Sequence, residues 1–323
     1  MLVPENKSAN YEKSAMNITD KKAFAEGLSL LKRPVLPLVN MVQFLYLTGP
    51  FATIEDVLAR LTKAVELAGI RYGNPQETLK PYADILKEFA VLKGKKKLTA
   101  SLPFIVDEKN EPVAKRQALE LWIKQHVLSR ELERINSLLC KPCGCVLCCT
   151  GPNSEFDEAS GYKGVMKQEY FEIPLEESEA DLFALPRVDT PDSRSATARS
   201  EPPLQIDNAP FYKQKMALYH WKNGWGLILP AGAVCPQLAA DTKRCTVYEK
   251  RPQVCRKPQI FAYILEKTPD TAKRSDGVLI PVYMARSKVL AVWDCPYVRK
   301  FQDEIGAYAE MGGLEPVFKK SKI

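Results

Sequence analysis

Residues 140–149 constrain this chain more than any other segment, because five of these ten residues are cysteines. A buried cysteine behaves as a small hydrophobic residue, so core packing gives no reason to crowd five of them together. Cys140 and Cys143 are separated by two residues, the spacing that lets two thiolates converge on one ion or cluster. Cys145 and Cys148 repeat this spacing. The segment therefore predicts a chain that folds around a metal.

The adjacent pair Cys148 and Cys149 bears on the kind of metal site. Successive side chains diverge by about 100° on a helix and point to opposite faces of a strand, so adjacent thiols rarely reach one mononuclear ion. A closed zinc site needs four ligands, whereas the chain has nine cysteines and only two histidines. We therefore expect sulfur ligands around a cluster or two neighbouring metal sites, with an iron–sulfur cluster favoured over zinc and both left open.

Four more cysteines follow in the last third of the chain, and the surroundings of one of them are typical of a ligand. Pro252 is expected to start a short helix, which places Cys255 in its first turn. Free backbone N–H groups and the helix dipole stabilise a thiolate at that position. These four cysteines are Cys235, Cys245, Cys255 and Cys295.

Three side chains near Cys255 leave two interpretations open. Arg251 and Arg256 either add positive charge that favours the thiolate or pair with the acidic middle of the chain. Tyr248 either belongs to the metal segment or is an ordinary core residue.

Residues 244–256 carry the most specific motif, Arg-Cys-x-x-Tyr-x-x-Arg-Pro-x-x-Cys-Arg, and the first group reads Cys-x-x-Cys-Gly followed by Cys-Cys. These motifs resemble the YkgJ-type cysteine cluster family, CxxCxxCC domains that are described as zinc- or iron-chelating. The resemblance covers residues 140–149 and 235–295. It implies eight metal-linked cysteines, which are Cys140, Cys143, Cys148, Cys149, Cys235, Cys245, Cys255 and Cys295.

The chain departs from the family pattern between the glycine and the paired cysteines, where three residues stand instead of one. Cys145 is among them and is therefore a ninth candidate ligand, able to replace one of the eight. Related domains occur in a flagellin lysine methylase, so the resemblance raises a metal-dependent methyltransferase or oxidoreductase as an alternative. No phosphate loop, nucleophile elbow or His-Glu-x-x-His motif occurs in the sequence, so no catalytic residue is assigned.

The N-terminal part of the chain is expected to be mostly helical. One helix is predicted over residues 54–68, with Thr53 and Asp56 as its capping box and Gly69 after its end. Another, over residues 115–139, leads directly into the cysteine segment.

Between those helices, residues 89–106 are predicted to form a hairpin with a basic turn. Helices followed by such a hairpin are typical of a winged helix, in which the turn contacts phosphates. A solvated basic turn is the alternative that we favour. The lysines concerned are Lys93, Lys95, Lys96 and Lys97.

The rest of the chain predicts a flexible stretch followed by strands. Residues 151–210 contain 13 acidic and 5 basic residues, and residues 189–203 within them have almost nothing apolar to bury, so we expect a flexible or extended excursion. Strands are predicted at residues 226–229, 278–284 and 289–293, and a helix at residues 296–311.

The expected fold class is α+β, in two parts. Residues 1–139 form a mostly helical region, and residues 140–323 form a small, irregular, cysteine-rich metal-binding domain with a few strands. The charged first residues lack the apolar stretch of a secretion signal, and no run of ~20 apolar residues could span a bilayer. We therefore expect a cytoplasmic protein without a membrane segment.

Three functions fit these expectations. The first is a metal protein with a structural or electron-transfer role, in which metal removal unfolds the part of the chain from residue 211 onward. The second is an enzyme that uses the metal. The third is an adaptor that binds a protein partner or, with weaker support, nucleic acid, and uses zinc as a structural element; the net formal charge of +7 gives this alternative its support.

Overall fold

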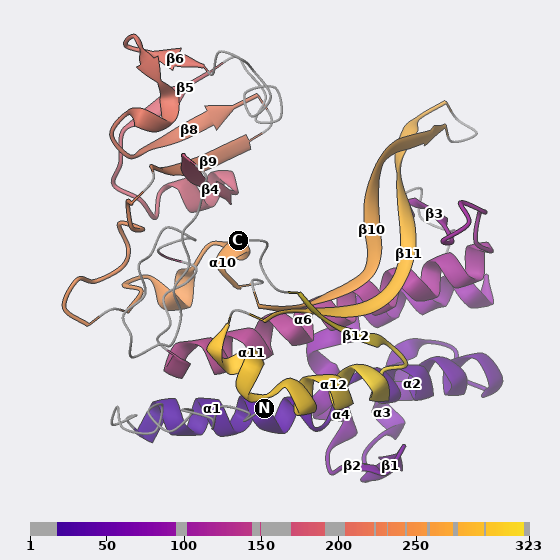
Figure 1. The fold of residues 1–323 in the computed structure, drawn as a ribbon. Helices are drawn as coiled ribbons and strands as arrows, with labels where there is room; N and C mark the ends of the chain where they lie inside the picture. Colours follow the sequence, from indigo (N-terminus) through magenta and orange to yellow (C-terminus); the bar gives the residue numbers. More distant parts are fainter. Residues whose placement is uncertain are drawn as a thin grey trace, which may run out of the picture.

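The computed structural model is an α+β protein, as predicted, with a helical layer, a long two-stranded arm and a second, smaller sheet (Figure 1). No helix among the described residues has both the length and the apolar composition needed to cross a bilayer. The structure describes residues 18–94, 102–143, 149, 169–190, 204–222, 224–230, 232–242, 244–256, 259–273, 277–293 and 295–319.

Helix α6 (Lys115–Cys143) is the central element of the helical layer. Its buried side chains recur every three or four residues, among them Leu119, Ile123 and Leu139, as an amphipathic helix requires. The helix predicted over residues 115–139 is confirmed and continues by one turn. Around it lie α1 (Ile18–Leu31), α2 (Leu36–Thr48), α3 (Ile54–Arg60), α4 (Pro75–Leu79) and α5 (Ala83–Leu86), with the 3-10 helices η1 (Lys80–Tyr82) and η2 (Lys87–Lys93).

The helix predicted over residues 54–68 has the correct start and the wrong end. The capping box of Thr53 and Asp56 is present, but α3 stops at Arg60. Beyond it, β1 (Val65–Leu67) and β2 (Ile70–Tyr72) form a hairpin whose side chains alternate between less and more exposed positions. The two turn residues, Ala68 and Gly69, both have positive φ, as a tight hairpin turn requires. The glycine thus closes a hairpin and does not cap a helix.

The hairpin predicted over residues 89–106 is wrong for the part of it that the structure describes. Its first half belongs to η2 and ends at Gly94, which has a φ of 67°. Its last residues form β3 (Phe104–Val106), which pairs in parallel with the distant strand β11 (Leu279–Val292). A long-range pairing therefore replaces the predicted local one.

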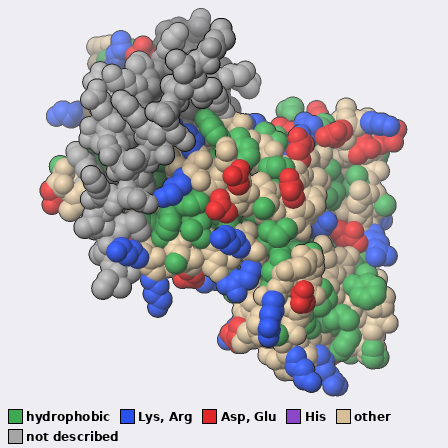
Figure 2. All heavy atoms as spheres, turned by 60° about the horizontal axis from the view of Figure 1, so that its bottom comes forward, with side chains coloured by type: hydrophobic (Ala, Val, Ile, Leu, Met, Phe, Trp, Pro, Cys, Tyr) green, Lys and Arg blue, Asp and Glu red, His purple; other side chains and the backbone are tan. Residues whose placement is uncertain are grey.

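Lys93 has an internal role in this region. Its ammonium group donates to the carbonyl oxygens of Gly49 and Phe51, at 3.2 Å each, and so binds the chain just after α2. Residues 95–97, the other lysines of the predicted turn, lie outside the described residues. On the face in Figure 2, the coloured basic side chains lie among acidic and apolar ones and do not form one continuous patch.

Strand β10 (Ile260–Lys273) pairs with β11 in an antiparallel arm that projects from the helical layer (Figure 1). Strands β12 (Glu315–Lys319) and β3 pair in parallel with β11. The strands predicted at residues 278–284 and 289–293 are two parts of β11. The predicted terminal helix divides into α11 (Pro296–Lys300) and α12 (Gln302–Met311).

Two amide side chains of α6 cover the inner edge of β10. Asn136 donates to the carbonyl oxygen of Ile260 at 2.7 Å and accepts from its N–H at 3.1 Å. Gln125 donates to the carbonyl of Ala262 at 3.2 Å and accepts from the N–H of Ile264 at 3.0 Å. An edge strand exposes backbone groups that invite pairing with another chain. Here the central helix satisfies these groups and fixes the base of the arm.

Glu131 is a buried carboxyl group in the middle of α6. It accepts hydrogen bonds from the Val35 N–H at 2.9 Å and from the Tyr308 hydroxyl at 2.7 Å. Burial raises the pKa of Glu131 to about 7. The group therefore links the start of α2 and helix α12 to α6, and its charge changes near neutral pH.

A second sheet lies apart from the arm and has its own small core, which includes Ile173, Leu227 and two cysteines, Cys149 and Cys235. Part of the predicted flexible stretch, residues 169–190, contributes regular elements to it. The sheet has the order β4 (Tyr170–Leu175), β9 (Gly224–Pro230), β8 (Ala217–Trp221), β5 (Arg187–Asp189), with α8 (Glu177–Ala180), η5 (Phe211–Lys213) and the pair β6 (Gln205–Ile206) and β7 (Ala209–Pro210) beside it.

Candidate metal centre

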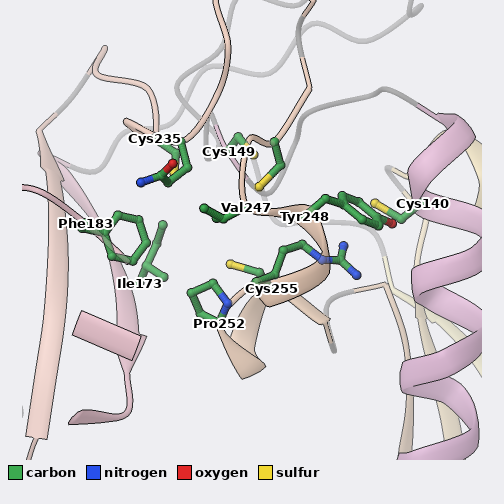
Figure 3. Close-up of a pocket in the computed structure, with 12 residues that line it drawn as sticks. Cys140, Cys149, Ile173, Phe183, Cys235, Val247, Tyr248, Pro252 and Cys255 are labelled. Carbon is green, nitrogen blue, oxygen red and sulfur yellow. The ribbon is translucent and has the colours of Figure 1, made fainter. Parts of the chain in front are cut away.

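The two cysteine groups, far apart in the sequence, meet at one cavity between α6 and the second sheet (Figure 3). The cavity has a volume of about 40 Å³ and is lined mainly by apolar side chains and thiols. Five of the nine predicted ligands line it, which are Cys140, Cys149, Cys235, Cys245 and Cys255.

Different local structures hold these thiols. Cys140 lies in the last turn of α6. The N–H of Cys235 donates to the carbonyl oxygen of Cys149 at 2.7 Å, so a backbone hydrogen bond joins the two sequence groups directly. Cys245 lies opposite Leu238 in an isolated antiparallel bridge. The cavity wall is therefore built from backbone contacts between distant segments.

Cys255 lies in the short helix α10 (Gln253–Arg256), as predicted. Pro252 directly precedes this helix, and the N–H of Cys255 donates to the Pro252 carbonyl at 2.8 Å. The sulfur atom of Cys255 is drawn at the cavity in Figure 3.

Two of the other four predicted ligands lie elsewhere in the structure. Cys143 and Cys295 are buried in the larger core, which also contains the helical layer and the base of the arm. Neither is among the described residues that line the cavity. Cys145 and Cys148 lie outside the described residues.

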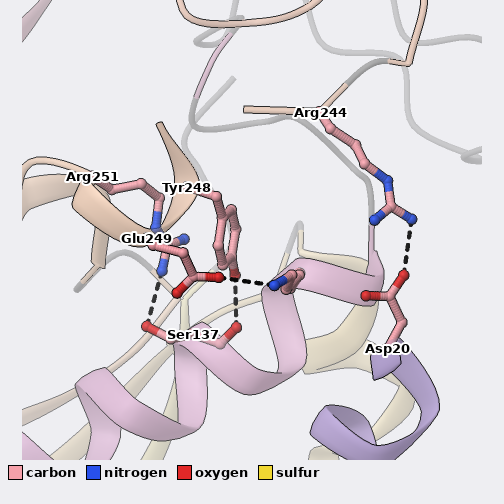
Figure 4. Close-up of polar contacts among 7 residues, drawn as sticks. Asp20, Ser137, Arg244, Tyr248, Glu249 and Arg251 are labelled. Carbon is pink, nitrogen blue, oxygen red and sulfur yellow. Dashed lines mark hydrogen bonds and ion pairs between the residues drawn. The ribbon is translucent and has the colours of Figure 1, made fainter. Parts of the chain in front are cut away.

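The motif residues around Cys245 and Cys255 fasten their segment to α6 (Figure 4). The Tyr248 hydroxyl donates to the carbonyl oxygen of Ser137 at 2.6 Å, and Arg251 donates to the Ser137 hydroxyl at 2.9 Å. The Arg251 guanidinium lies 3.8 Å from the centre of the Tyr248 ring. Tyr248 thus attaches its segment to α6 through a specific hydrogen bond, in addition to packing.

Ion pairs extend this attachment. Arg256 lies 2.8 Å from Glu133 of α6, and Arg244 lies 3.0 Å from Asp20 of α1, whose side chain is 1% exposed. Arg256 therefore forms an ion pair, which was one of its two interpretations. Its partner lies on α6 and not in the acidic middle stretch. Lys141 donates to Glu249 at 2.8 Å, and this hydrogen bond lowers the pKa of Glu249.

Sequence reasoning missed the partners on α6 and α1. Glu133, Ser137 and Lys141 recur at four-residue spacing and so lie on one face of α6, just before or beside the first cysteines. That periodicity was the available signal, because it marks a polar face on a helix that leads into the cysteine segment. Nothing in the sequence marks Asp20.

The donor chemistry of the cavity fits a thiophilic metal. Thiolates select zinc, copper(I) and iron–sulfur clusters over hard cations. Within the described ranges, no three Cys, His, Asp or Glu side chains lie close enough together to hold an ion as they stand. Both histidines contact tryptophans: His126 meets Trp122 edge to face, and His220 stacks on Trp225. Among the described residues that line this cavity, the metal-binding side chains are the thiols.

Comparison with known proteins agrees with this chemistry. No curated protein and no solved structure matches the chain significantly. Residues 139–275 match the family model CxxCxxCC, whose description is "Putative zinc- or iron-chelating domain". The match includes the first cysteine group and three cysteines of the second, and it ends before Cys295. Residues 139–275 of this chain are therefore similar to the CxxCxxCC domain.

Proposed function

We propose that this chain binds an iron–sulfur cluster through thiolates of the shared cavity and uses it in a structural or electron-transfer role. The observation that carries the proposal is the convergence of five cysteines, from both sequence groups, on one small cavity. A structural zinc ion is closed by four ligands, so five lining thiols exceed its requirement. Cys145 and Cys148 stand in the same ten-residue segment and add to the excess.

The protein's contribution is to hold the sulfur atoms in mainly apolar surroundings. Ile173, Phe183 and Val247 line the cavity beside the thiols, and such a shell limits the access of water to a metal. The bound group would supply electron storage or a cross-link between the α6 end and the second sheet. Both roles need the two cysteine groups together.

The test is anaerobic purification without added metal, followed by elemental analysis, acid-labile sulfide determination and an absorption spectrum of one sample. We expect iron and sulfide with the broad visible absorption of a cluster. Stoichiometric zinc in a colourless protein would replace the iron proposal with a structural zinc site. Folded protein that takes up neither metal would contradict metal binding altogether.

A further inference from the structure

Arg251 is the charged side chain among the described residues that line the thiol cavity. It is only 5% exposed, although buried arginines are rare and a buried charge is costly unless other charges compensate it. The Glu249 carboxylate is close enough for Arg251 to lower its pKa, and the five thiols line the same cavity as the guanidinium.

The surroundings hold this guanidinium in one orientation. Its Nη2 donates to the Ser137 hydroxyl at 2.9 Å, and its plane lies over the Tyr248 ring. Tyr248 is itself fixed, because its hydroxyl donates to the Ser137 carbonyl. Ser137 of α6, three residues before Cys140, thus anchors both the Arg251 guanidinium and the Tyr248 ring.

We propose that Arg251 is a positioning residue that supplies the fixed positive charge for an anionic metal–thiolate group in this cavity. The inference rests on the proposed metal binding. Thiolate ligands outnumber the charges of a divalent ion, so a four-thiolate site is anionic. A cation held at its edge stabilises that group when water is excluded.

Arginine suits this role better than lysine. Its planar guanidinium stacks on an aromatic ring and is less strongly hydrated than an ammonium group. A lysine at position 251 would keep the charge but lose the stack and the fixed direction. The two contributions can therefore be separated by substitution.

The experiment measures Co²⁺ affinity of reduced, metal-free protein by chelator competition, with thiolate-to-cobalt absorption as the signal. Arg251→Met is expected to weaken binding by about 10- to 100-fold, the usual effect of removing an outer partner of a metal site. Arg251→Lys should recover part of that loss. Ser137→Ala, which keeps the charge and releases its anchor, should fall between wild type and Arg251→Met.

Arg187→Met is the matched control, because Arg187 also lies over an aromatic ring, that of Trp225, at 5.3 Å, and pairs with Asp181 away from the cavity. Near-UV circular dichroism reports folding of every variant. If Arg251→Met does not fold, the Co²⁺ affinities of Ser137→Ala and Arg187→Met are compared instead. A weaker affinity in Ser137→Ala than in Arg187→Met supports the role of Arg251, and equal affinities contradict it.

The outcomes distinguish this inference from the proposed function. Wild-type protein that binds neither Co²⁺ nor iron would overturn both. Wild-type binding with equal affinities for Arg251→Met, Arg251→Lys and Arg187→Met would overturn the role of Arg251 alone. An equal loss for the methionine and lysine variants would also overturn it, because packing and not charge would then be responsible.

Discussion

At the scale of single residues, the chain places ionisable groups where their charge has structural consequences. Arg251 carries a charge to the wall of a cavity of thiols, and Asp20 anchors Arg244 from a nearly inaccessible position. Glu131 differs from both, because a backbone N–H and a hydroxyl donate to it. Burial opposes its ionisation, and these two hydrogen bonds and the positive charge of Arg134 offset that effect only in part.

Glu131 makes stability depend on pH. Its pKa is raised from 4.5 to about 7 in the folded chain, so the folded state binds more protons than the unfolded state between these values. The free energy of unfolding should therefore fall as pH rises through this window, by on the order of 3 kcal/mol from this group. Glu131→Gln, followed by urea unfolding at several pH values, should show a shallower fall than wild type. Parallel curves for the two proteins would contradict this account.

At the scale of elements, helix α6 organises the molecule. One part of it covers the edge of β10 through Gln125 and Asn136, and its last turns receive the motif segment through Ser137 and carry Cys140. The same helix therefore positions the arm and the metal centre. A shift of α6 along its axis would disturb both.

Asn136→Ala should destabilise the chain and expose the strand edge. The substitution leaves the N–H and carbonyl of Ile260, and the Tyr297 hydroxyl, without their amide partner. Each buried group left unsatisfied costs roughly 1–3 kcal/mol. We expect a lower Tm and concentration-dependent aggregation, measured by calorimetry and light scattering. Gln43→Ala, which removes an amide bonded to Glu120 and not to a strand, should show neither aggregation nor a comparable loss.

At the scale of the whole molecule, the described residues form three hydrophobic cores. The largest core joins the helical layer to the base of the arm and to α11 and α12, and two smaller cores lie on the two faces of the second sheet. Residues from 260 onward contribute to the largest core. We therefore expect metal removal to unfold a shorter part of the chain than everything from residue 211 onward.

Chelation should loosen the cysteine segment and leave the helical body folded. Hydrogen exchange of protein with and without metal should speed up over residues 235–256, whose thiols line the cavity. Amides of α6 and of the arm base should keep their protection, because apolar packing and side-chain hydrogen bonds hold them. Global loss of protection would show instead that the metal also supports the largest core.

Much of the site could be predicted from the sequence, and less of the fold around it. The cysteine spacing and the proline before Cys255 are local features of the sequence, so the sequence alone could predict the ligands and the short helix. The four-residue spacing of Glu133, Ser137 and Lys141 marks a polar face on α6 but not its partners, and no local pattern marks the contact of Asp20 with Arg244. The hairpin at Ala68 and Gly69 was missed because its apolar residues also fit a helical period. The positive φ of both turn residues fits a hairpin turn and not a continued helix.

The central claim is that both cysteine groups serve one metal centre. Its most direct test compares metal content in Cys149→Ser, Cys255→Ser and the double variant, with Val254→Ser as the control for changes in α10. We predict that each single cysteine variant loses the metal almost as fully as the double variant, while Val254→Ser keeps it. Partial losses that add up in the double variant would mean two independent sites, and wild-type metal content in either single variant would contradict the shared centre.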